Sequence, residues 1–242
     1  MSAILTAQGL VAGYEPGLPI VRGASIHVDR GEIVVILGPN GAGKSSLIKA
    51  IAGLVPISEG SVVLDGTDIT TLPAHRKIRA GLAFVPQTEN VFPLMSVEEN
   101  LRLSIGIFPG RDARGGIDEM FALFPDLARQ RSLMAGSLSG GQRQMLAAAR
   151  ALVVKPQVLM LDEPSAGLSP KFVEQVFARL SDIRATGVTI LLVEQNARAA
   201  LAIGDRAYVL VEGREAHEGP AAGLWDDPVV AELYLGQRKE PA

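Results

Sequence analysis

The residues with the clearest chemistry occupy positions 38 to 46, which read Gly-Pro-Asn-Gly-Ala-Gly-Lys-Ser-Ser. Their spacing matches G-x-x-x-x-G-K-[ST], in which a glycine-rich turn and the helix that follows present backbone amides to a polyphosphate. Those amides offer only partial positive charge, whereas Lys44 adds a full charge, worth roughly 4 kcal/mol at ~4 Å in an effective dielectric of about 20. The Ser45 hydroxyl suits Mg²⁺. The stretch therefore predicts a site for a nucleoside triphosphate.

A second serine and glycine cluster, Leu-Ser-Gly-Gly-Gln at 138–142, precedes an expected helix at 143–152. An ordinary N-cap would explain Ser139, but the paired glycines exceed that need. The cluster is therefore a candidate for a second anion site at a helix N-terminus.

Polar residues also follow two apolar runs. Asp162 and Glu163 end an expected strand at 158–161, and adjacent carboxylates on a strand point to opposite faces. We therefore expect one to face a metal and the other a water. Gln87 follows an expected strand at 83–85, at the end where α/β proteins gather ligands, although by itself it reads as a solvated loop residue.

The elements that position these residues follow from hydrophobic periodicity and turn signals. Strands are expected at 4–10, 20–28, 33–37, 60–64, 83–85, 158–161, 189–193, 207–211 and 214–218. Helices are expected at 43–52, 74–80, from Ser96, at 117–133 with a break at Pro125, and at 143–152, 171–184 and 229–235. The segment 106–116 reads as a mobile linker, and the apolar loop 91–94 as a protein contact. The alternation predicts a mostly parallel sheet after two antiparallel strands.

Composition narrows the function further. The chain has 242 residues, 48% of them hydrophobic, and a net charge of −3, which argues against a nucleic-acid partner. There are no cysteines, so disulfides, cysteine–zinc sites and thiol catalysis are excluded. The first ten residues do not read as a signal peptide, and no apolar run approaches the ~20 residues of a membrane helix. We expect any membrane role to come through a partner.

In their order along the chain, the phosphate loop, Gln87, the 138–142 cluster, the strand ending in Asp162 and Glu163, and the loop 165–169 resemble an ABC transporter ATP-binding subunit. The resemblance covers about residues 4–237. It is finest for the LivF type of branched-chain amino-acid importer, through the segments 123–127, 164–170, 192–198 and 234–236.

This resemblance implies an α/β fold: a P-loop NTPase core with a mostly parallel sheet, an N-terminal antiparallel β subdomain and an α-helical signature subdomain. It implies a single nucleotide-binding domain over 1–242, with the helical subdomain inserted at about 88–155. It also implies ATP and Mg²⁺ as cofactors, and hydrolysis of ATP coupled to solute import.

The resemblance also assigns roles. Glu163 is the implied general base, with Lys44, Gln87 and Gln195 as further catalytic residues. Mg²⁺ is assigned to Ser45, Gln87 and Asp162. ATP binding is assigned to Tyr14, which stacks on adenine, and to Gly38, Pro39, Asn40, Gly41, Ala42, Gly43, Lys44, Ser45 and Ser46. The signature residues Leu138, Ser139, Gly140, Gly141 and Gln142 are assigned to the ATP of a partner subunit.

Subunits of this family work as head-to-tail dimers beneath transmembrane permease subunits. The resemblance therefore implies a second ATPase subunit, either a copy or a paralogue, and indirectly a periplasmic solute-binding protein. The implied location is the cytoplasmic face of the bacterial inner membrane.

Two positions depart from the family pattern. Gln195 stands where most members have histidine, and Ser169 where the loop usually ends in aspartate. Glutamine can donate a hydrogen bond to a γ-phosphate but cannot carry an imidazolium charge. The alternatives are therefore a urea or amide importer, an exporter, a regulatory subunit with low turnover, and a non-transport ATPase acting on nucleic acid or ribosomes.

Overall fold

The computed structural model of the chain describes residues 3–108, 110–228 and 230. The strands are β1 (Ala3–Ala12), β2 (Val21–Asp29), β3 (Ile33–Leu37), β4 (Ile57–Leu64), β5 (Thr67–Asp68), β6 (Leu82–Val85), β7 (Val158–Asp162), β8 (Thr189–Val193), β9 (Arg206–Val211) and β10 (Arg214–Pro220). The helices are α1 (Lys44–Ala52), α2 (Ala74–Arg79), α3 (Val97–Gly106), α4 (Ala113–Leu123), α5 (Pro125–Arg129), α6 (Gly140–Leu152), α7 (Pro170–Ala185) and α8 (Ala197–Ile203). Short 3-10 turns lie at Ala135–Ser137 and Leu224–Asp226.

The main sheet has the strand order β10-β9-β3-β8-β7-β6. The neighbours from β9 to β6 pair in parallel, and β10 pairs antiparallel with β9. Strands β3, β7 and β8 are buried at every residue, because aliphatic runs of this kind are covered on both faces of a parallel sheet. The expected mostly parallel sheet is confirmed. Its topology brings the carboxyl ends of β3, β8, β7 and β6 to one edge.

A smaller antiparallel sheet has the order β2-β1-β4-β5. The turn between β4 and β5 has left-handed backbone at Asp65 and Gly66, with φ of 47° and 76°, as tight hairpins require. This sheet is the antiparallel β layer that the N-terminal sequence predicts.

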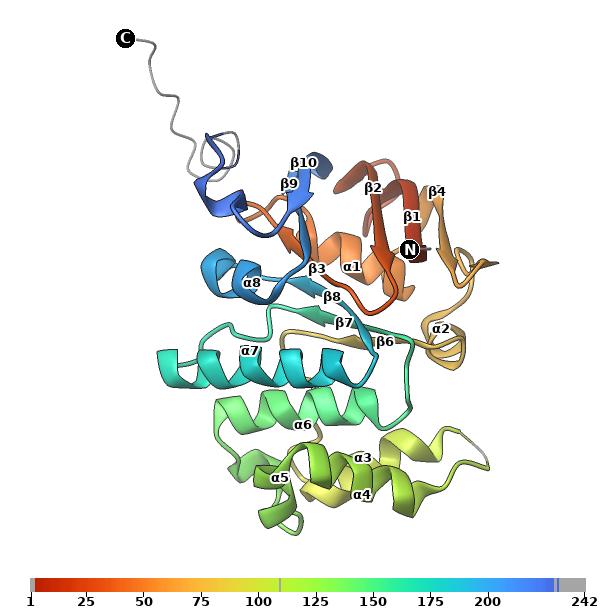
Figure 1. Ribbon diagram of the computed structural model, residues 1–242. Coiled ribbons are helices and arrows are strands. Elements are labelled where there is room, and N and C mark those ends of the chain that lie inside the picture. The colour runs from red at the N-terminus through yellow and green to blue at the C-terminus, as the bar shows by residue number, and fades with distance from the viewer. Residues whose placement is uncertain (1–2, 109, 229, 231–242) are drawn as a thin grey trace.

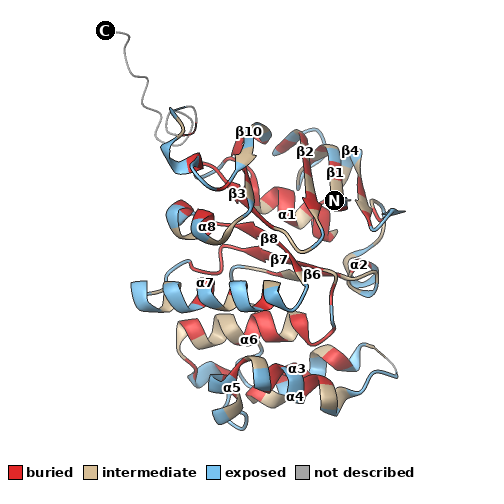
Figure 2. Ribbon diagram, in the orientation of Figure 1, coloured by how far each residue is buried: buried red, intermediate tan, exposed pale blue. Residues whose placement is uncertain are grey.

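Helices cover both faces of the main sheet. Figure 1 shows α1 between the two sheets, and α6 and α7 on the other side, with α3, α4 and α5 beyond α6. Alternate residues of β3 supply two separate cores: Val34 and Ile36 pack with α1 and the small sheet, whereas Val35 and Leu37 pack with the helical side. The buried faces are continuous in Figure 2. The phosphate-loop helix and the helix after the 138–142 cluster therefore lie on opposite faces.

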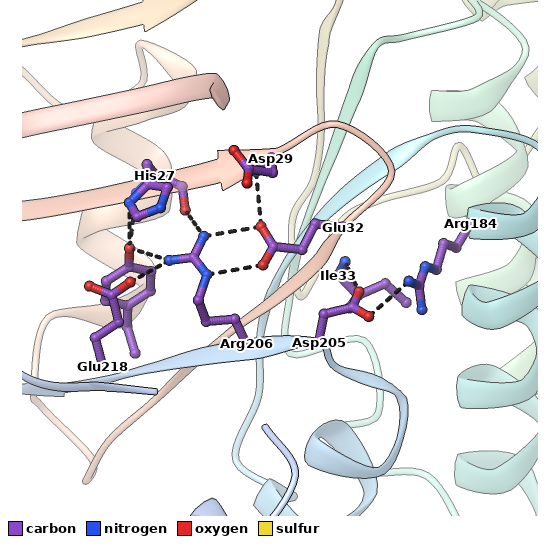
Figure 3. Close-up of polar contacts among 9 residues, drawn as sticks. His27, Asp29, Glu32, Ile33, Arg184, Asp205, Arg206 and Glu218 are labelled. Carbon is purple, nitrogen blue, oxygen red and sulfur yellow. Dashed lines mark hydrogen bonds and ion pairs between the residues drawn. The ribbon is translucent and has the colours of Figure 1, made fainter. Parts of the chain in front are cut away.

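A polar network joins the two sheets at the amino ends of β3 and β9 (Figure 3). The Nε and Nη2 atoms of Arg206 donate to the two carboxylate oxygens of Glu32, at 3.0 Å each. Its Nη1 donates to Glu218 at 2.6 Å and to the Tyr208 hydroxyl at 2.7 Å. That hydroxyl accepts from the backbone N–H of His27 in β2 at 3.2 Å. One guanidinium thus links four strands or strand ends.

The structure corrects two expectations about the helical part of the chain. The expected linker 106–116 includes the start of α4, because Asp112 caps that helix by accepting from the N–H of Gly115, and Gly116 packs closely against Ile105. The expected helix at 117–133 breaks at Pro125, as predicted, but ends at Arg129 rather than continuing to 133. The capped helix start at Ser96 is confirmed as a complete capping box.

The expected short helix at 229–235 and the segment 234–236 lie outside the described residues, apart from residue 230. Among the helices that the structure does describe, none is both long and apolar enough to cross a bilayer.

Candidate nucleotide-binding site

The phosphate loop begins where β3 ends. At Gly38 φ is 146°, and a Cβ there would lie 2.1 Å from the carbonyl oxygen of Leu210, so this position accepts only glycine. The Nζ of Lys44 donates to the carbonyl oxygens of Gly38 at 2.9 Å and Pro39 at 3.1 Å. The lysine is thus folded back over its own loop, and burial lowers its pKa against the opposing charges of Glu163 and Asp162.

The remaining residues assigned to this loop lie around that lysine. Asn40 and Gly41 are exposed at its tip, and the N–H of Ala42 donates to the carbonyl of Pro39 at 3.2 Å. Gly43 caps α1 and Ser46 is buried in its first turn. The loop and the helix start therefore form one compact concave backbone segment, of the kind that accepts an anion.

Ser45 and Asp162 meet across the sheet. The Ser45 hydroxyl donates to Oδ1 of Asp162 at 2.8 Å, and the Nζ of Lys49 lies 4.0 Å from Oδ2. Burial raises the pKa of Asp162, and the Ser45 hydrogen bond and the Lys49 charge oppose that shift. The hydroxyl and the carboxylate are hard oxygen donors that fit a Mg²⁺ shell completed by phosphate and water. Lys49 is a contact that our sequence prediction missed, although its spacing places it one turn after Ser45.

Glu163 lies beside this pair and is almost fully buried. The side-chain amides of Gln87 and Gln195 both donate to its Oε2, at 3.0 Å and 2.8 Å. These residues follow β6, β7 and β8, which are neighbours in the sheet, so the predicted gathering at the strand ends is observed for all three side chains. Gln87 is therefore more than the solvated loop residue that it resembles in isolation.

The reason for the two carboxylates acting differently is not the one that strand alternation predicts. Asp162 is the last residue of β7, whereas Glu163 has left-handed backbone with φ of 48° and has left the strand. Its N–H donates to the carbonyl of Val193 at 2.8 Å, which stabilises this unusual conformation. A backbone reversal, rather than the pleat, turns Glu163 toward the two glutamines.

The 138–142 cluster forms the start of α6, after Leu138, which is buried. Ser139 and Gln142 make a reciprocal capping box, with the Gln142 amide oxygen accepting from the Ser139 N–H at 2.9 Å. A Cβ on Gly141 would lie 2.6 Å from the Phe172 ring, and one on Gly140 would lie 3.1 Å from Leu168. Close packing against α7 thus accounts for glycines that the sequence attributes to an anion alone. The cluster and the phosphate loop lie on opposite faces of the sheet and are not brought together within one chain (Figure 1).

Two further residues connect the Gln87 loop to α6, and neither was predicted. The Gln144 amide donates to the backbone carbonyl of Gln87 at 3.4 Å and accepts from the Asn90 amide at 2.9 Å. Arg150 donates to the Asn90 carbonyl, and its guanidinium lies 4.6 Å from the centre of the Phe92 ring. No sequence spacing would have indicated these contacts, because they join segments more than fifty residues apart.

Tyr14, assigned to adenine, is 56% exposed on the loop after β1. That loop leads to Ile20, whose side chain lies 3.4 Å from where a Cβ on Gly43 would stand. The tyrosine is therefore on the side of the molecule that the phosphate loop faces, and its contact with a base stays a prediction.

Residues 21–166 match the family model described as ABC transporter. The chain is 45% identical to the probable branched-chain amino acid transport ATP-binding protein LivF of Archaeoglobus fulgidus, over 96% of this chain and 99% of that protein. It is 41% identical to the high-affinity branched-chain amino acid transport ATP-binding protein BraG of Pseudomonas aeruginosa, over 93% and 97%. It is 37% identical to the lipopolysaccharide export system ATP-binding protein LptB of Acidithiobacillus ferridurans, over 98% and 99%.

Solved structures agree with the sequence matches. The fold is similar to the ADP conformation of MJ1267, an ATP-binding cassette of an ABC transporter, with a TM-score of 0.86 and 30% identity over 98% of this chain and all of that one. It is also similar to the dimeric post-hydrolysis state of the cassette MJ0796 bound to ADP and Pi, with a TM-score of 0.79 and 28% identity over 90% and 98%.

Proposed function

The chain belongs to the ABC transporter family of ATP-binding subunits, and we propose on that premise that it powers the uptake of branched-chain amino acids. It is an ATPase of a family in which hydrolysis is coupled to transport. The solute is supported by the relatives with 45% and 41% identity, both of which are described as branched-chain amino acid transport proteins. The relative with 37% identity serves lipopolysaccharide export, so export is the second candidate.

The observation that carries the catalytic part of the proposal is the meeting of Gln87 and Gln195 on one oxygen of Glu163. Two amide donors fix the orientation of the carboxylate without neutralising it, because an amide carries no charge. We assign Glu163 as the general base that accepts a proton from the attacking water. The two glutamines hold it in place, and Gln195 supplies the orientation that a histidine gives elsewhere in the family.

The phosphate loop supplies the electrostatic part. When ATP binds, Lys44 exchanges the carbonyls of Gly38 and Pro39 for phosphate oxygens, so its full charge is delivered where negative charge is greatest. The loop amides from Gly38 to Ser46 hold the polyphosphate, and Tyr14 stacks on adenine. Ser45, Asp162 and the Gln87 amide oxygen would hold Mg²⁺, which supplies a second full positive charge at the phosphates.

We propose that residues 1–242 form one nucleotide-binding domain, with 88–155 as its helical subdomain, and that two such subunits assemble head to tail. Because α6 starts on the face opposite to α1, its signature residues can reach only the ATP of another subunit. Permease subunits would contact a groove of about 380 Å³ lined by Phe92, Leu103, Ile107 and Arg150, beside the exposed Leu94. This groove adjoins the Gln87 loop, which connects it to the ATP site. A periplasmic solute-binding protein would complete the importer at the inner membrane.

The test uses the chain assembled with its permease subunits and its partner ATPase in lipid vesicles. We expect Glu163→Gln to retain ATP binding but to lose ATP turnover at least about 100-fold, because general-base catalysis typically contributes that much. Leucine uptake should stop with it. Glu59→Gln, an exposed glutamate in β4, is the matched control and should behave as wild type.

Turnover at the wild-type rate in Glu163→Gln would disprove the assigned mechanism. Hydrolysis without transport of leucine, isoleucine or valine would disprove the proposed solute, and extraction of lipopolysaccharide by the same complex would favour the second candidate.

A further inference from the structure

Glu194 is a buried carboxylate for which the catalytic scheme above has no use. It follows β8 and is only 1% exposed. Its Oε1 accepts from the N–H of Ser165 at 3.0 Å, and its Oε2 accepts from the Ser165 hydroxyl at 2.8 Å. Oε2 also accepts from the backbone N–H groups of Gln195 at 3.1 Å and Asn196 at 3.4 Å. One carboxylate thus satisfies four donors on two separate loops.

The partners of this carboxylate in those contacts are neutral. Burial therefore raises the pKa of Glu194, although all four hydrogen bonds oppose the shift. A buried anion bonded to neutral donors is costly compared with an apolar side chain. Two acceptor oxygens explain its presence, since a carboxamide of the same size offers only one oxygen and would place its NH₂ group against a donor.

The two loops that Glu194 joins both belong to the hydrolytic site. On one side, Gln195 donates to Glu163 through its side chain while its backbone is fixed by Glu194. On the other side, Ser165 starts the loop that leads to Leu168, and Leu168 lies against Gly140 at the start of α6. That loop is also tied to Glu163, whose carbonyl accepts from the N–H of Ala166 at 3.1 Å.

We propose that Glu194 is a positioning residue for ATP hydrolysis, which fixes the Gln195 turn and the loop 165–169 as a single unit. The unit keeps the Gln195 amide on Glu163 and keeps the start of α6 in register with it. Glu194 acts only through these neighbours and touches neither the nucleotide nor the water. The inference rests on the proposed function and adds a residue to its hydrolytic step.

The direct test is Glu194→Gln in the assembled complex, with Mg·ATP as the substrate. The side chain keeps its size but loses one acceptor, so either Ser165 or Gln195 is left with an unsatisfied N–H. We expect kcat to fall about tenfold, which corresponds to roughly 1.4 kcal/mol of activation free energy. KM for Mg·ATP should stay within about twofold, because the phosphate loop is untouched. Glu59→Gln should change neither value.

A second variant covers the case in which Glu194→Gln does not fold. Ser165→Ala removes one donor and leaves the other three hydrogen bonds, so it should lower kcat about threefold, again at constant KM. In the double variant the loss should equal that of Glu194→Gln alone, because both changes release the same tie.

Three results would overturn the inference: an unchanged kcat in Ser165→Ala, a raised KM with kcat intact, or losses that multiply in the double variant. These differ from a failure of the proposed function. An inactive wild-type complex would remove both proposals, whereas an active wild type with unaffected variants removes only the role of Glu194.

Discussion

At the carboxyl edge of the main sheet, Lys44 and Asp162 are buried, and burial shifts the pKa of each toward its neutral form. At the amino edge, Glu32 and Arg206 are partly buried and show the reverse. Burial alone would raise the pKa of Glu32, but hydrogen bonds from Arg206 and from the backbone of Asp29 lower it. The pKa of Arg206 is raised although burial opposes this, because Glu32, Tyr208 and Glu218 surround it.

The difference follows from pairing. The guanidinium of Arg206 meets Glu32 with two parallel hydrogen bonds, so each charge stabilises the other (Figure 3). Lys44 instead donates to backbone carbonyls, and Asp162 accepts from a serine hydroxyl with Lys49 at 4.0 Å. One edge has its charges satisfied internally and serves stability. The other holds charges that a triphosphate and Mg²⁺ would satisfy better, at a cost to stability in their absence.

The largest expected effect is on ligand binding at the carboxyl edge. Lys44→Ala should weaken ATP binding by about 4 kcal/mol, or roughly 10³-fold, because it removes a full charge close to the phosphates. The free energy of unfolding should change little, since the lost contacts are offset by the removal of a desolvated charge. Titration with Mg·ATP and urea unfolding measure the two quantities. Lys171→Ala, an exposed lysine on α7, is the control. A large loss of stability with unchanged affinity would contradict the comparison.

The next effect is on stability at the amino edge. Arg206→Met should lower the free energy of unfolding by about 3 kcal/mol, because it leaves Glu32, whose side chain is only 14% exposed, without its partner. ATP affinity of the folded protein should not change. Adding Glu32→Gln should recover part of the loss, since the unpaired charge is then removed. The exposed pair of Arg129 and Asp126 gives the control: Arg129→Met should cost less than about 1 kcal/mol.

Arg206→Met would contradict the comparison if it lowered ATP affinity as strongly as stability, because the amino edge would then take part in the site. Urea unfolding and Mg·ATP titration of the same preparation decide this directly.

These edges also show what the sequence could and could not predict. The phosphate loop was predictable to the residue, because its glycines, its lysine and the strand before it are local features. The family pattern supplied Gln87, Glu163 and Gln195, but not their contact. That contact depends on β6, β7 and β8 being neighbours and on the reversed backbone at Glu163, both of which arise from tertiary structure.

The misses have the same origin. Nothing in the sequence near Glu194 or Lys49 indicates a partner, since Ser165 and Asp162 are distant along the chain. The segment 106–116 has the glycine content of a linker, yet the Asp112 cap and packing on Ile105 outweigh the poor helix propensity of Gly115 and Gly116. Arg206 and Glu32 carry no motif at all, although they hold the two sheets together.

Lys77 provides the smallest and sharpest test of the pairing argument. It lies on α2, is 1% exposed, and its Nζ donates to the carbonyl of Ile51 at 2.9 Å, in the last turn of the phosphate-loop helix α1. Its place is structural, but its acceptor is a carbonyl rather than a carboxylate. Burial lowers its pKa from 10.5 to about 8, and only the exposed Asp68 opposes the shift. If pairing decides the direction of a shift, Lys77 should behave like Lys44 although it binds no ligand.

The sign of the pH dependence follows from linkage. Between about pH 8 and 10.5 the unfolded chain holds a proton on Lys77 that the folded chain has released, so stability rises with pH in this window. The unfolding free energy of wild type, minus that of Lys77→Met, should therefore increase by about 2 kcal/mol from pH 7.5 to pH 10. Urea unfolding at both values measures it, and the subtraction cancels the other titrating groups. Lys171→Met, at an exposed site, should give a flat difference. A flat difference for Lys77 as well would mean that its charge is stabilised by the carboxyl end of α1. In that case position along the helix, not pairing with a carboxylate, would set the direction of these shifts.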